Sequence, residues 1–400
     1  MLVYVRNLLY MNLRLPNKRV SSLLSMVNYL SFILASPSSS TIIVSSPAFI
    51  CFTSFLYITK YSFGSKSSPQ CFFDGITKDY LRNIIHQNHW DDPKMVALFS
   101  SALSPIWVSK VLVELKEEPK EALEFFKWAK SRTGFSHTTE SYTILVHILF
   151  HARLYFDATS ILKELILSRS VFLGFDVFDM LWSTRNVCVY GFGVFDALFS
   201  VLVELGMLEE ANQCFMKMKR FRVLPKTRSC NALLHRLCKF GKGDLLMKFF
   251  NDMVETGIGP SIFTYNIMID YLCKEGDIGT ARLKFLQMKQ MGITPDIVTY
   301  NSLIDGYGKA GFLNESVCIL EEMKKAGCQP DIITYNALIN CFCKFERMPQ
   351  AFEFLHEMKV RGLKPNVVTY STLIDALCKV GMLQVAIKLF VDMRKSWSFS

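Results

Sequence analysis

Five lysines recur at a spacing of 35 residues, and they present the most direct chemistry in the sequence. They are Lys239, Lys274, Lys309, Lys344 and Lys379. A single lysine at such a position is a solvated surface charge, whereas five in one register form a line of positive charge. Such a line is suited to contact a phosphate backbone, and five contacts to a single strand give log K a slope of about −3.5 against log salt.

The lysines belong to a longer repeat with the same period. The segments Ile297–Asp331, Ile332–Asn366 and Val367–Ser400 nearly superimpose, and Ile262–Asp296 is the same unit. Each segment begins with two apolar residues followed by Thr-Tyr-Asn or Thr-Tyr-Ser. A fixed period in this range is typical of a solenoid, in which stacked units bury one continuous core.

Two helices are expected in each repeat. In the repeat 297–331 the first helix is predicted over Thr299–Lys309, with Thr299 or Asp296 as its cap and Gly311 as its end. The second is predicted over Asn314–Lys325 and ends before Gly327. Two rows are expected to form the core between helices: Tyr265, Tyr300, Tyr335 and Tyr370, and Met253, Met288, Met323, Met358 and Met393.

Composition narrows the class of protein. Half of the residues are hydrophobic, and the net charge of +10 is compatible with a nucleic-acid partner. Of the twelve cysteines, Cys238, Cys273, Cys343 and Cys378 share the 35-residue register, with Gly308 in the remaining place, as expected of a small buried residue. No Cys-x-x-Cys pair occurs, so we predict no metal site, no disulfide framework and a reducing compartment.

Motifs of catalysis are not found in the sequence. It has no Gly-rich phosphate loop, no Gly-x-Ser-x-Gly element and no zinc-deaminase signature. We therefore expect no enzymatic activity, no cofactor and no small-molecule substrate.

The first 73 residues have the composition of a targeting segment. They contain six basic residues and fifteen serines, and the first acidic residue is Asp74. A basic, serine-rich stretch without acids is typical of an organelle transit peptide, which we expect to be disordered. Two alternatives are a membrane anchor in the uncharged stretch Val20–Thr59 and a misplaced start of the reading frame. The unpaired cysteines downstream disfavour a secretory signal.

The rest of the sequence divides into four parts. Residues 74–138 are expected to be helical, 139–173 to be a degenerate repeat, 174–191 to be a connector and 192–400 to be the regular array. The repeats of the array are 192–226, 227–261, 262–296, 297–331, 332–366 and 367–400. In the last repeat Trp397 replaces the usual glycine and Ser400 the usual proline, so we expect a truncated array with an exposed last helix.

The repeated unit resembles the pentatricopeptide repeat. It contains Val-Thr-Tyr-Asn-x-Leu-Ile-Asp-Gly-x-x-Lys-x-Gly and a second helix that ends in Met-Lys-x-x-Gly-x-x-Pro-Asp. The match is strong over Thr227–Asp392, good over Phe192–Lys226 and weak back to Ser104. The resemblance, to the P class of the family, implies an all-α fold. This fold would be a right-handed α-solenoid of helix-turn-helix repeats that binds single-stranded RNA in plant mitochondria or chloroplasts.

By this resemblance, two side chains of each repeat read one RNA base. One follows the tyrosine of the first helix, in the row Asn231, Asn266, Asn301, Asn336 and Ser371. The other is the last residue of the repeat, in the row Ser261, Asp296, Asp331 and Asn366. An asparagine amide offers a donor and an acceptor to a pyrimidine edge, and a neighbouring aspartate can fix its orientation. The alternative is that both rows are only helix-start caps.

The same resemblance implies a base preference for each pair. Asn with Asp favours U, Asn with Ser favours C, Asn with Asn accepts either pyrimidine, and Ser371 indicates a purine. The expected core is 5′-C-U-U-(C/U)-purine-3′, while the upstream pairs Asp196/Lys226 and Thr143/Leu173 match no base. A third row is expected either to sandwich the bases or to pack in the core: Phe263, Val298, Ile333 and Val368.

The sequence therefore predicts a sequence-specific RNA-binding protein that acts on the stability, splicing, processing or translation of an organellar transcript. Other RNA-processing factors are possible partners, and the mitochondrion is the expected location, with the chloroplast as the alternative. Two other functions stay open. One is a protein-binding scaffold of the tetratricopeptide type, which the uniform Asn, Asp and Lys rows disfavour, and the other is a guide subunit for RNA editing.

Overall fold

The described part of the chain is built from helices. The computed structural model describes residues 104–168, 176–188 and 192–397, and these ranges hold helices and no strand. The predicted transit peptide and the alternative membrane anchor, both within residues 1–73, lie outside them. Within the same ranges, no helix combines the length and the apolar character that a membrane span needs.

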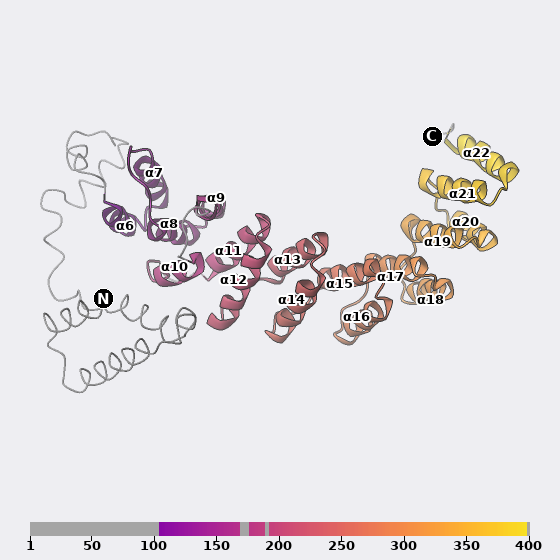
Figure 1. Cartoon of the computed structure of the whole chain (residues 1–400), viewed down its shortest axis with the longest axis horizontal. Coiled ribbons are helices and arrows are strands. Elements are labelled where there is room, and N and C mark those ends of the chain that lie inside the picture. The colour runs from indigo at the N-terminus through magenta and orange to yellow at the C-terminus, as the bar shows by residue number, and fades with distance from the viewer. Residues whose placement is uncertain (1–103, 169–175, 189–191, 398–400) are drawn as a thin grey trace, which may run out of the picture. The chain divides into compact units, whose positions relative to one another are not determined.

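The array consists of consecutive helical pairs, which Figure 1 shows in chain order. The pairs are α11 (Gly193–Glu204) with α12 (Leu208–Phe221), α13 (Thr227–Lys239) with α14 (Gly243–Glu255), α15 (Ile262–Glu275) with α16 (Ile278–Gln290), α17 (Ile297–Lys309) with α18 (Leu313–Lys325), α19 (Ile332–Lys344) with α20 (Met348–Val360), and α21 (Val367–Lys379) with α22 (Leu383–Trp397). In the repeat 297–331 both helices start within two residues of the predicted positions.

Among the described residues upstream of the array, 104–168 and 176–188, the structure has five further helices. They are α6 (Pro105–Glu114), α7 (Pro119–Lys130), α8 (Thr139–His151), α9 (Tyr155–Ser168) and α10 (Val177–Thr184). The segment expected to be a connector thus contains a helix, α10, which packs against α8 and buries Phe178 and Leu181. Its start is capped by Asp176, whose carboxylate accepts a hydrogen bond from the backbone N–H of Phe178.

The degenerate repeat 139–173 keeps one side-chain contact of the regular repeats. The hydroxyl of Tyr142 donates to Glu164, 22 residues further on. In the repeat 332–366, Tyr335 makes the same contact with Glu357, at 3.0 Å and with the same separation. The pair α8 and α9 therefore has the internal register of a regular repeat, although its sequence is divergent.

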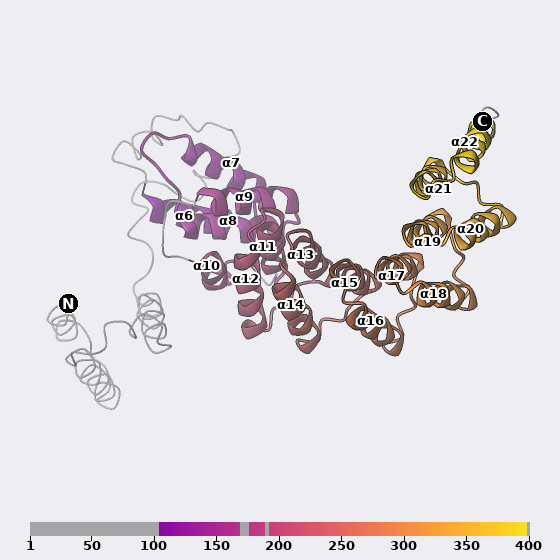
Figure 2. The same ribbon diagram turned by 45° about the vertical axis from the view of Figure 1, so that its right-hand side comes forward.

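The helices of the array form two rows, as Figures 1 and 2 show. The first helices α11, α13, α15, α17, α19 and α21 contact one another in succession, and each second helix from α12 to α20 lies against its own first helix, while most also contact the next one. The tyrosine row is at most 3% exposed, and Met253, Met288, Met323 and Met358 are fully buried. The predicted core rows are thus confirmed except at Met393, which is half-buried. A single helical hairpin leaves an apolar stripe that its neighbours must cover.

Neighbouring first helices approach each other closely through small residues. A Cβ on Gly308 of α17 would lie 2.3 Å from Sγ of Cys341 in α19, so this position has no room for a side chain. In the predicted cysteine register, Cys273 and Cys343 are buried, but Cys238 is half-buried and Cys378 is exposed. The prediction of a buried row is therefore wrong at Cys378, over which no helix of the described chain packs.

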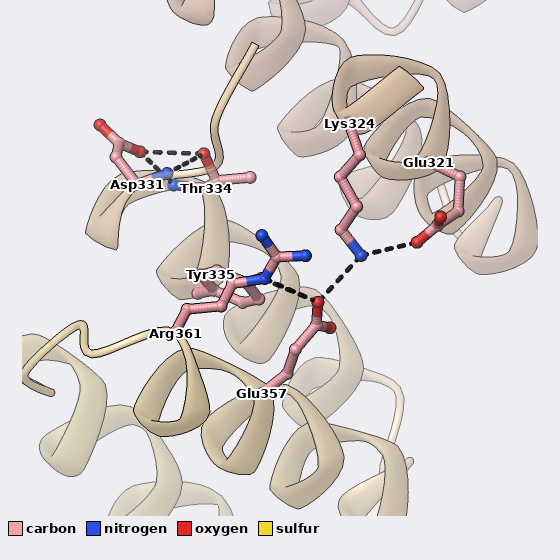
Figure 3. Close-up of polar contacts among 7 residues, drawn as sticks. All are labelled: Glu321, Lys324, Asp331, Thr334, Tyr335, Glu357 and Arg361. Carbon is pink, nitrogen blue, oxygen red and sulfur yellow. Dashed lines mark hydrogen bonds and ion pairs between the residues drawn. The ribbon is translucent and has the colours of Figure 1, made fainter. Parts of the chain in front are cut away.

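Second helices of successive repeats are joined by ion pairs. Lys324 Nζ in α18 lies 2.9 Å from Glu357 Oε1 in α20, and Figure 3 shows Glu357 also accepting from Arg361. The same spacing of 33 residues recurs in Lys289–Glu322 and Lys219–Asp252. Half-exposed pairs of this kind contribute at most about 1 kcal/mol each, so the apolar rows dominate stability.

A glycine in the left-handed conformation ends most first helices. Gly276 has φ +82°, and Gly311 has φ +88°. In the repeat 332–366 the equivalent residue is Glu346, which adopts φ +58°. A residue with a Cβ pays about 1–2 kcal/mol in this region, so the turn after α19 is strained relative to its counterparts.

Replacing Glu346 with glycine should therefore stabilise the protein by about 1 kcal/mol, because glycine adopts a positive φ without a Cβ clash. Gly276→Ala should destabilise by a similar amount, since a Cβ there meets no atom within 4 Å and only the backbone conformation is penalised. Urea denaturation followed by circular dichroism would measure both variants. A stabilising Gly276→Ala, or a destabilising Glu346→Gly, would contradict the explanation.

Candidate nucleic-acid interface

One face of each first helix carries the predicted contact residues. In α17 these are Val298, Asn301 and Lys309, and Asp305 lies between the last two. Residues separated by three, seven and eleven positions share one side of an α-helix, because the helix repeats every 3.6 residues. The stripe from Val298 to Lys309 is about 16 Å long at a rise of 1.5 Å per residue. An apolar, an amide and a charged group therefore follow each other along one side of the helix, where Val298 and Lys309 are exposed and Asn301 is half-buried.

The two predicted base-reading rows contact each other in every complete pair. Each asparagine Nδ2 donates to the last residue of its own repeat, over 30 residues of sequence. The distances are 3.1 Å for Asn231–Ser261, 3.0 Å for Asn266–Asp296, 3.3 Å for Asn301–Asp331 and 3.3 Å for Asn336–Asn366. Ser371 is exposed on α21, and its hydroxyl donates to the backbone carbonyl of Val368 at 3.2 Å.

In the four repeats from 227–261 to 332–366, the last residue also caps the first helix of the next repeat. Asp296 accepts a hydrogen bond of 3.0 Å from the backbone N–H of Thr299, and Thr299 Oγ1 accepts one from the backbone N–H of Asp296 at 3.2 Å. This capping box recurs with Ser261, Asp331 and Asn366. The cap explanation is therefore correct for this row, but the asparagine row lies inside the helix, where no cap is needed.

The threonine of each capping box also reaches back to the preceding repeat. Its Oγ1 lies within hydrogen-bond distance of the asparagine Oδ1, over 33 residues of sequence. The distances are 2.7 Å for Thr264–Asn231, 2.5 Å for Thr299–Asn266, 2.7 Å for Thr334–Asn301 and 2.6 Å for Thr369–Asn336. All four threonines are fully buried. Sequence reasoning gave Thr299 only a capping role, although its recurrence beside Asn was visible.

The network affects the ionisation of Asp296. Burial opposes the charged form, but the hydrogen bonds from Thr299 and Asn266 outweigh it and hold the carboxyl pKa below its usual value of 3.8. Asp296 is therefore an anion at neutral pH and can only accept hydrogen bonds. This supports the orientation in which the amide nitrogen of Asn266 faces the carboxylate.

The third predicted row is exposed. Phe263, Val298, Ile333 and Val368 have 68%, 52%, 64% and 56% of their surface accessible. The core-packing alternative is therefore wrong for these residues, because each sits at the start of its helix on the side that carries the asparagine. Exposed apolar groups next to hydrogen-bonding groups can stack on nucleobases, which present a π-face whatever their identity.

The lysine row is exposed but partly neutralised. Three of the five lysines pair with an aspartate one turn earlier, at 2.6 Å each: Lys274–Asp270, Lys309–Asp305 and Lys379–Asp375. Lys239 and Lys344 have His235 and Asn340 at that position. The expected line of five positive charges is thus uneven. These aspartates were missed by sequence reasoning, although an i, i+4 pair is detectable from spacing.

The repeat 192–226 keeps the contact between its two reading positions but changes the chemistry. Asp196 Oδ1 accepts a hydrogen bond of 3.0 Å from the backbone N–H of Lys226, and both residues line a cavity of about 520 Å³ that also includes His151. The corresponding residue of the degenerate repeat, Thr143, is fully buried. Its partner Leu173 lies outside the described residues.

Metal ions have no evident place in this interface. Across residues 104–168, 176–188 and 192–397, no group of three or more His, Cys, Asp or Glu side chains is arranged to hold one. The interface consists of hydrogen-bonded polar side chains, an exposed apolar row and lysines.

The fold and the interface together define an α-solenoid of two-helix repeats with a recurring polar stripe on the first helices. The chain belongs to the pentatricopeptide repeat family. The profile of the PPR repeat family matches residues 225–274, 260–309, 295–344 and 330–379, and that of the PPR repeat matches 194–223 and 368–397.

Plant proteins are among the relatives. A pentatricopeptide repeat-containing protein of Arabidopsis thaliana is 58% identical over 263 residues, which cover 65% of this chain and 34% of the relative. A second Arabidopsis pentatricopeptide repeat-containing protein, named mitochondrial, is 34% identical over 186 residues, which cover 46% of this chain and 35% of the relative. The chain thus spans about a third of the length of these curated relatives.

Solved structures of the same repeat family are also similar. The crystal structure of the maize pentatricopeptide repeat protein PPR10 matches with a TM-score of 0.45 and 20% identity, over 84% of this chain and 48% of that chain. PPR10 in complex with an 18-nucleotide psaJ RNA element matches with a TM-score of 0.42 and 19% identity, over 94% of this chain and 54% of that chain.

The lowered pKa of Asp296 predicts how its contribution to stability depends on pH. A carboxylate whose pKa falls on folding stabilises the protein above its unfolded pKa, and this contribution is lost as the pH falls through the folded pKa. The difference in free energy of unfolding between the wild type and Asp296→Asn should be constant from about pH 7 to about pH 5 and shrink only below the usual carboxyl pKa. Denaturant titrations at several pH values would measure it. A difference that already shrinks above pH 5 would contradict the proposed ionisation.

The lysine–aspartate pairs predict a change in RNA affinity and in its salt dependence. Asp305→Asn should free Lys309 for phosphate, raise affinity for single-stranded RNA roughly two- to fivefold and steepen the salt slope by up to about 0.7. The matched control is Asn340→Asp, which places the same carboxylate one turn before Lys344 and should have the opposite effect. Fluorescence anisotropy at about 50 and about 200 mM salt would measure both. Equal slopes for all three proteins would show that these lysines do not meet phosphates.

Proposed function

We propose that this protein binds single-stranded RNA in a sequence-specific manner, as a non-enzymatic factor of organellar RNA metabolism. The observation that carries the proposal is the recurring contact between an asparagine and the last residue of its repeat. An amide has two N–H donors and two acceptor lone pairs. One N–H of the Asn301 amide donates to Asp331, and one lone pair of its oxygen accepts from Thr334. One N–H donor and one acceptor lone pair of the amide remain.

The neighbouring groups suit a base that approaches this amide. Val298 and Ile333 are exposed apolar residues at the starts of successive first helices, and a base between the two repeats could stack between them. Lys309 lies two helical turns after Asn301, where a phosphate could follow the base. One repeat thus supplies hydrogen bonds, stacking and charge for one nucleotide, which is the one-base-per-repeat recognition known for such arrays.

The proposed base preferences follow the four complete pairs. Asn231 with Ser261 is assigned to C, Asn266 with Asp296 and Asn301 with Asp331 to U, and Asn336 with Asn366 to either pyrimidine, while Ser371 is assigned to a purine. The proposed core is therefore 5′-C-U-U-(C/U)-purine-3′. The uniform pairs favour this proposal over a peptide-binding scaffold, because peptide grooves need pockets that differ from one to the next.

We further propose that the protein acts in the mitochondrion, with the chloroplast as the alternative. Several relatives with pentatricopeptide repeats are named mitochondrial, and the basic, serine-rich first 73 residues are compatible with an organelle transit peptide. The step of RNA metabolism would be masking or remodelling of one transcript, which affects its stability, splicing, processing or translation.

Binding of the full chain to a single-stranded RNA that contains 5′-CUUUA-3′ tests the proposed function. We expect this RNA to bind more tightly than a permuted RNA of equal composition. Asn301→Ala should weaken binding about five- to tenfold through the loss of hydrogen bonds to one base. The matched control is Asn314→Ala, an exposed asparagine on the second helix α18, which should leave affinity unchanged.

Three other results would each revise the proposal. Salt-sensitive binding without preference would keep the lysine contacts and remove the base assignments. An equal loss in both alanine variants would remove the role of the asparagine row. A folded protein that binds neither RNA would favour the protein-binding scaffold.

A further inference from the structure

The contacts between neighbouring repeats point to a second determinant of base recognition. The side-chain amide of each base-reading asparagine lies between two groups of the repeat boundary. Asn301 Nδ2 lies 3.3 Å from Asp331 Oδ1, and Asn301 Oδ1 lies 2.7 Å from Thr334 Oγ1. Asp331 is the cap residue before α19, and Thr334 lies in the first turn of that helix.

The direction of these hydrogen bonds follows from the chemistry of the groups. Two oxygen atoms at 2.7 Å need one proton between them, and the amide oxygen has none, so Thr334 donates to Asn301. The threonine has one proton, and the alternative acceptor, Asp331 Oδ1, is farther away at 2.9 Å. The backbone N–H of Asp331 points at the same hydroxyl from 3.1 Å, so Thr334 Oγ1 accepts there. Figure 3 shows these contacts between Asp331 and Thr334.

The two partners therefore specify the same orientation of the amide. A flipped amide would bring its oxygen against the carboxylate of Asp331, which has no proton to share, and would lose the hydrogen bond from the threonine. The threonine is fully buried, so water cannot replace the partner that its hydroxyl would lose. The orientation of Asn301 is thus set by the repeat that follows it.

We infer that Thr264, Thr299, Thr334 and Thr369 are positioning residues for base recognition, each of which orients the base-reading asparagine of the preceding repeat. This inference rests on the proposed function, because it concerns the same interface. It adds a third residue, 33 positions after the asparagine, to each base-reading pair. It also means that the reading of one base requires the first turn of the next repeat.

The boundary between the repeats 192–226 and 227–261 offers an internal comparison. The residue equivalent to the threonine is Ser229, and its hydroxyl accepts from Ser200 at 3.1 Å. Asp196, at the asparagine position, is bonded instead to the backbone N–H of Lys226. The helical pair α13 and α14 still forms without the threonine bond. A hydrogen bond from this hydroxyl to the base-reading position of the preceding repeat is therefore not needed to fold a repeat, because Ser229 bonds to Ser200 instead.

The contribution of Ser261 differs from that of the aspartates. Its hydroxyl can donate as well as accept, so Ser261 alone leaves both orientations of the Asn231 amide open. Thr264, at 2.7 Å from Asn231 Oδ1, is the group that distinguishes them. The inferred role of threonine is therefore largest in the pair assigned to C.

The test compares Thr334→Val with Thr334→Ser in the full chain. Valine keeps the shape of threonine and removes the hydroxyl, whereas serine keeps the hydroxyl. RNAs that differ from 5′-CUUUA-3′ at one base each would report discrimination at every position. We expect Thr334→Val to reduce discrimination about tenfold at the third base, which is assigned to Asn301, and Thr334→Ser to retain it. Discrimination at the fourth base, assigned to the repeat that contains Thr334, should be unchanged.

The expected effect falls on the base of the preceding repeat and not on the base of the repeat that contains Thr334. This difference distinguishes a positioning role from a loss of structure. A merely structural role of Thr334 would impair its own repeat or weaken all positions together. Unchanged discrimination at the third base in Thr334→Val would overturn the inference, as would a loss that is confined to the fourth base. A loss in Thr334→Ser equal to that in Thr334→Val would also overturn it.

A measurement without RNA keeps the inference testable if the proposed function fails. If the wild type discriminates between no RNAs, the function is wrong, but the orientation of the amide can still be observed. In protein labelled with ¹⁵N-asparagine, the side-chain NH₂ resonances of Asn301 should shift in Thr334→Val and stay in place in Thr334→Ser. Asn301→Ser would assign these resonances by their disappearance. Resonances that are the same in all Thr334 variants would show that the threonine does not orient the amide.

Discussion

The candidate interface depends on one short hydrogen-bond network that recurs at four boundaries between repeats. The last residue of a repeat caps the next first helix, and the threonine of that cap bonds back to the asparagine of the preceding repeat. A helix start has free N–H groups that need acceptors in any protein. Here the acceptor that satisfies this need also fixes a polar side chain on the exposed face. Helix formation and the geometry of the interface are therefore consequences of the same few atoms.

The interface carries less unpaired positive charge than the net charge of +10 suggests. Three lysines of the row are held by aspartates of their own helices, and each such pair is weak enough for a phosphate to compete with it. General attraction to polyanions is then limited, while the proposed contacts to bases are unaffected by these ion pairs. Phosphate contacts position a nucleic acid and base contacts specify it, so this balance favours selectivity over strength.

The upstream repeats show which features are required for the fold and which are found only in the interface. Helices α8 to α12 pack against one another and α11 packs against α13, and the contact Tyr142–Glu164 is kept. At the base-reading positions of these repeats, however, Thr143 is buried and Asp196 accepts a hydrogen bond from a backbone group. Apolar rows and tight turns are thus sufficient for stacking. The asparagine and threonine rows are an addition to that scaffold, which is why we assign them to recognition.

Local patterns in the sequence predicted the period, the two helices of each repeat and the buried tyrosine and methionine rows, whereas the pairing of the two reading rows was expected only from the resemblance to the repeat family. These depend on helix periodicity and on capping, which act within a few residues. The aspartates beside the lysines could also have been predicted, since an i, i+4 spacing is visible in the sequence.

Only the tertiary structure decided the exposure of Phe263, the exposure of Cys378, the helix at Val177–Thr184 and the bond from Thr334 to Asn301. The two exposures and the bond depend on the rotation and offset between successive repeats, whereas the helix α10 depends on its packing against α8. No single repeat encodes that offset, because it emerges from how apolar rows interlock once the helices are stacked.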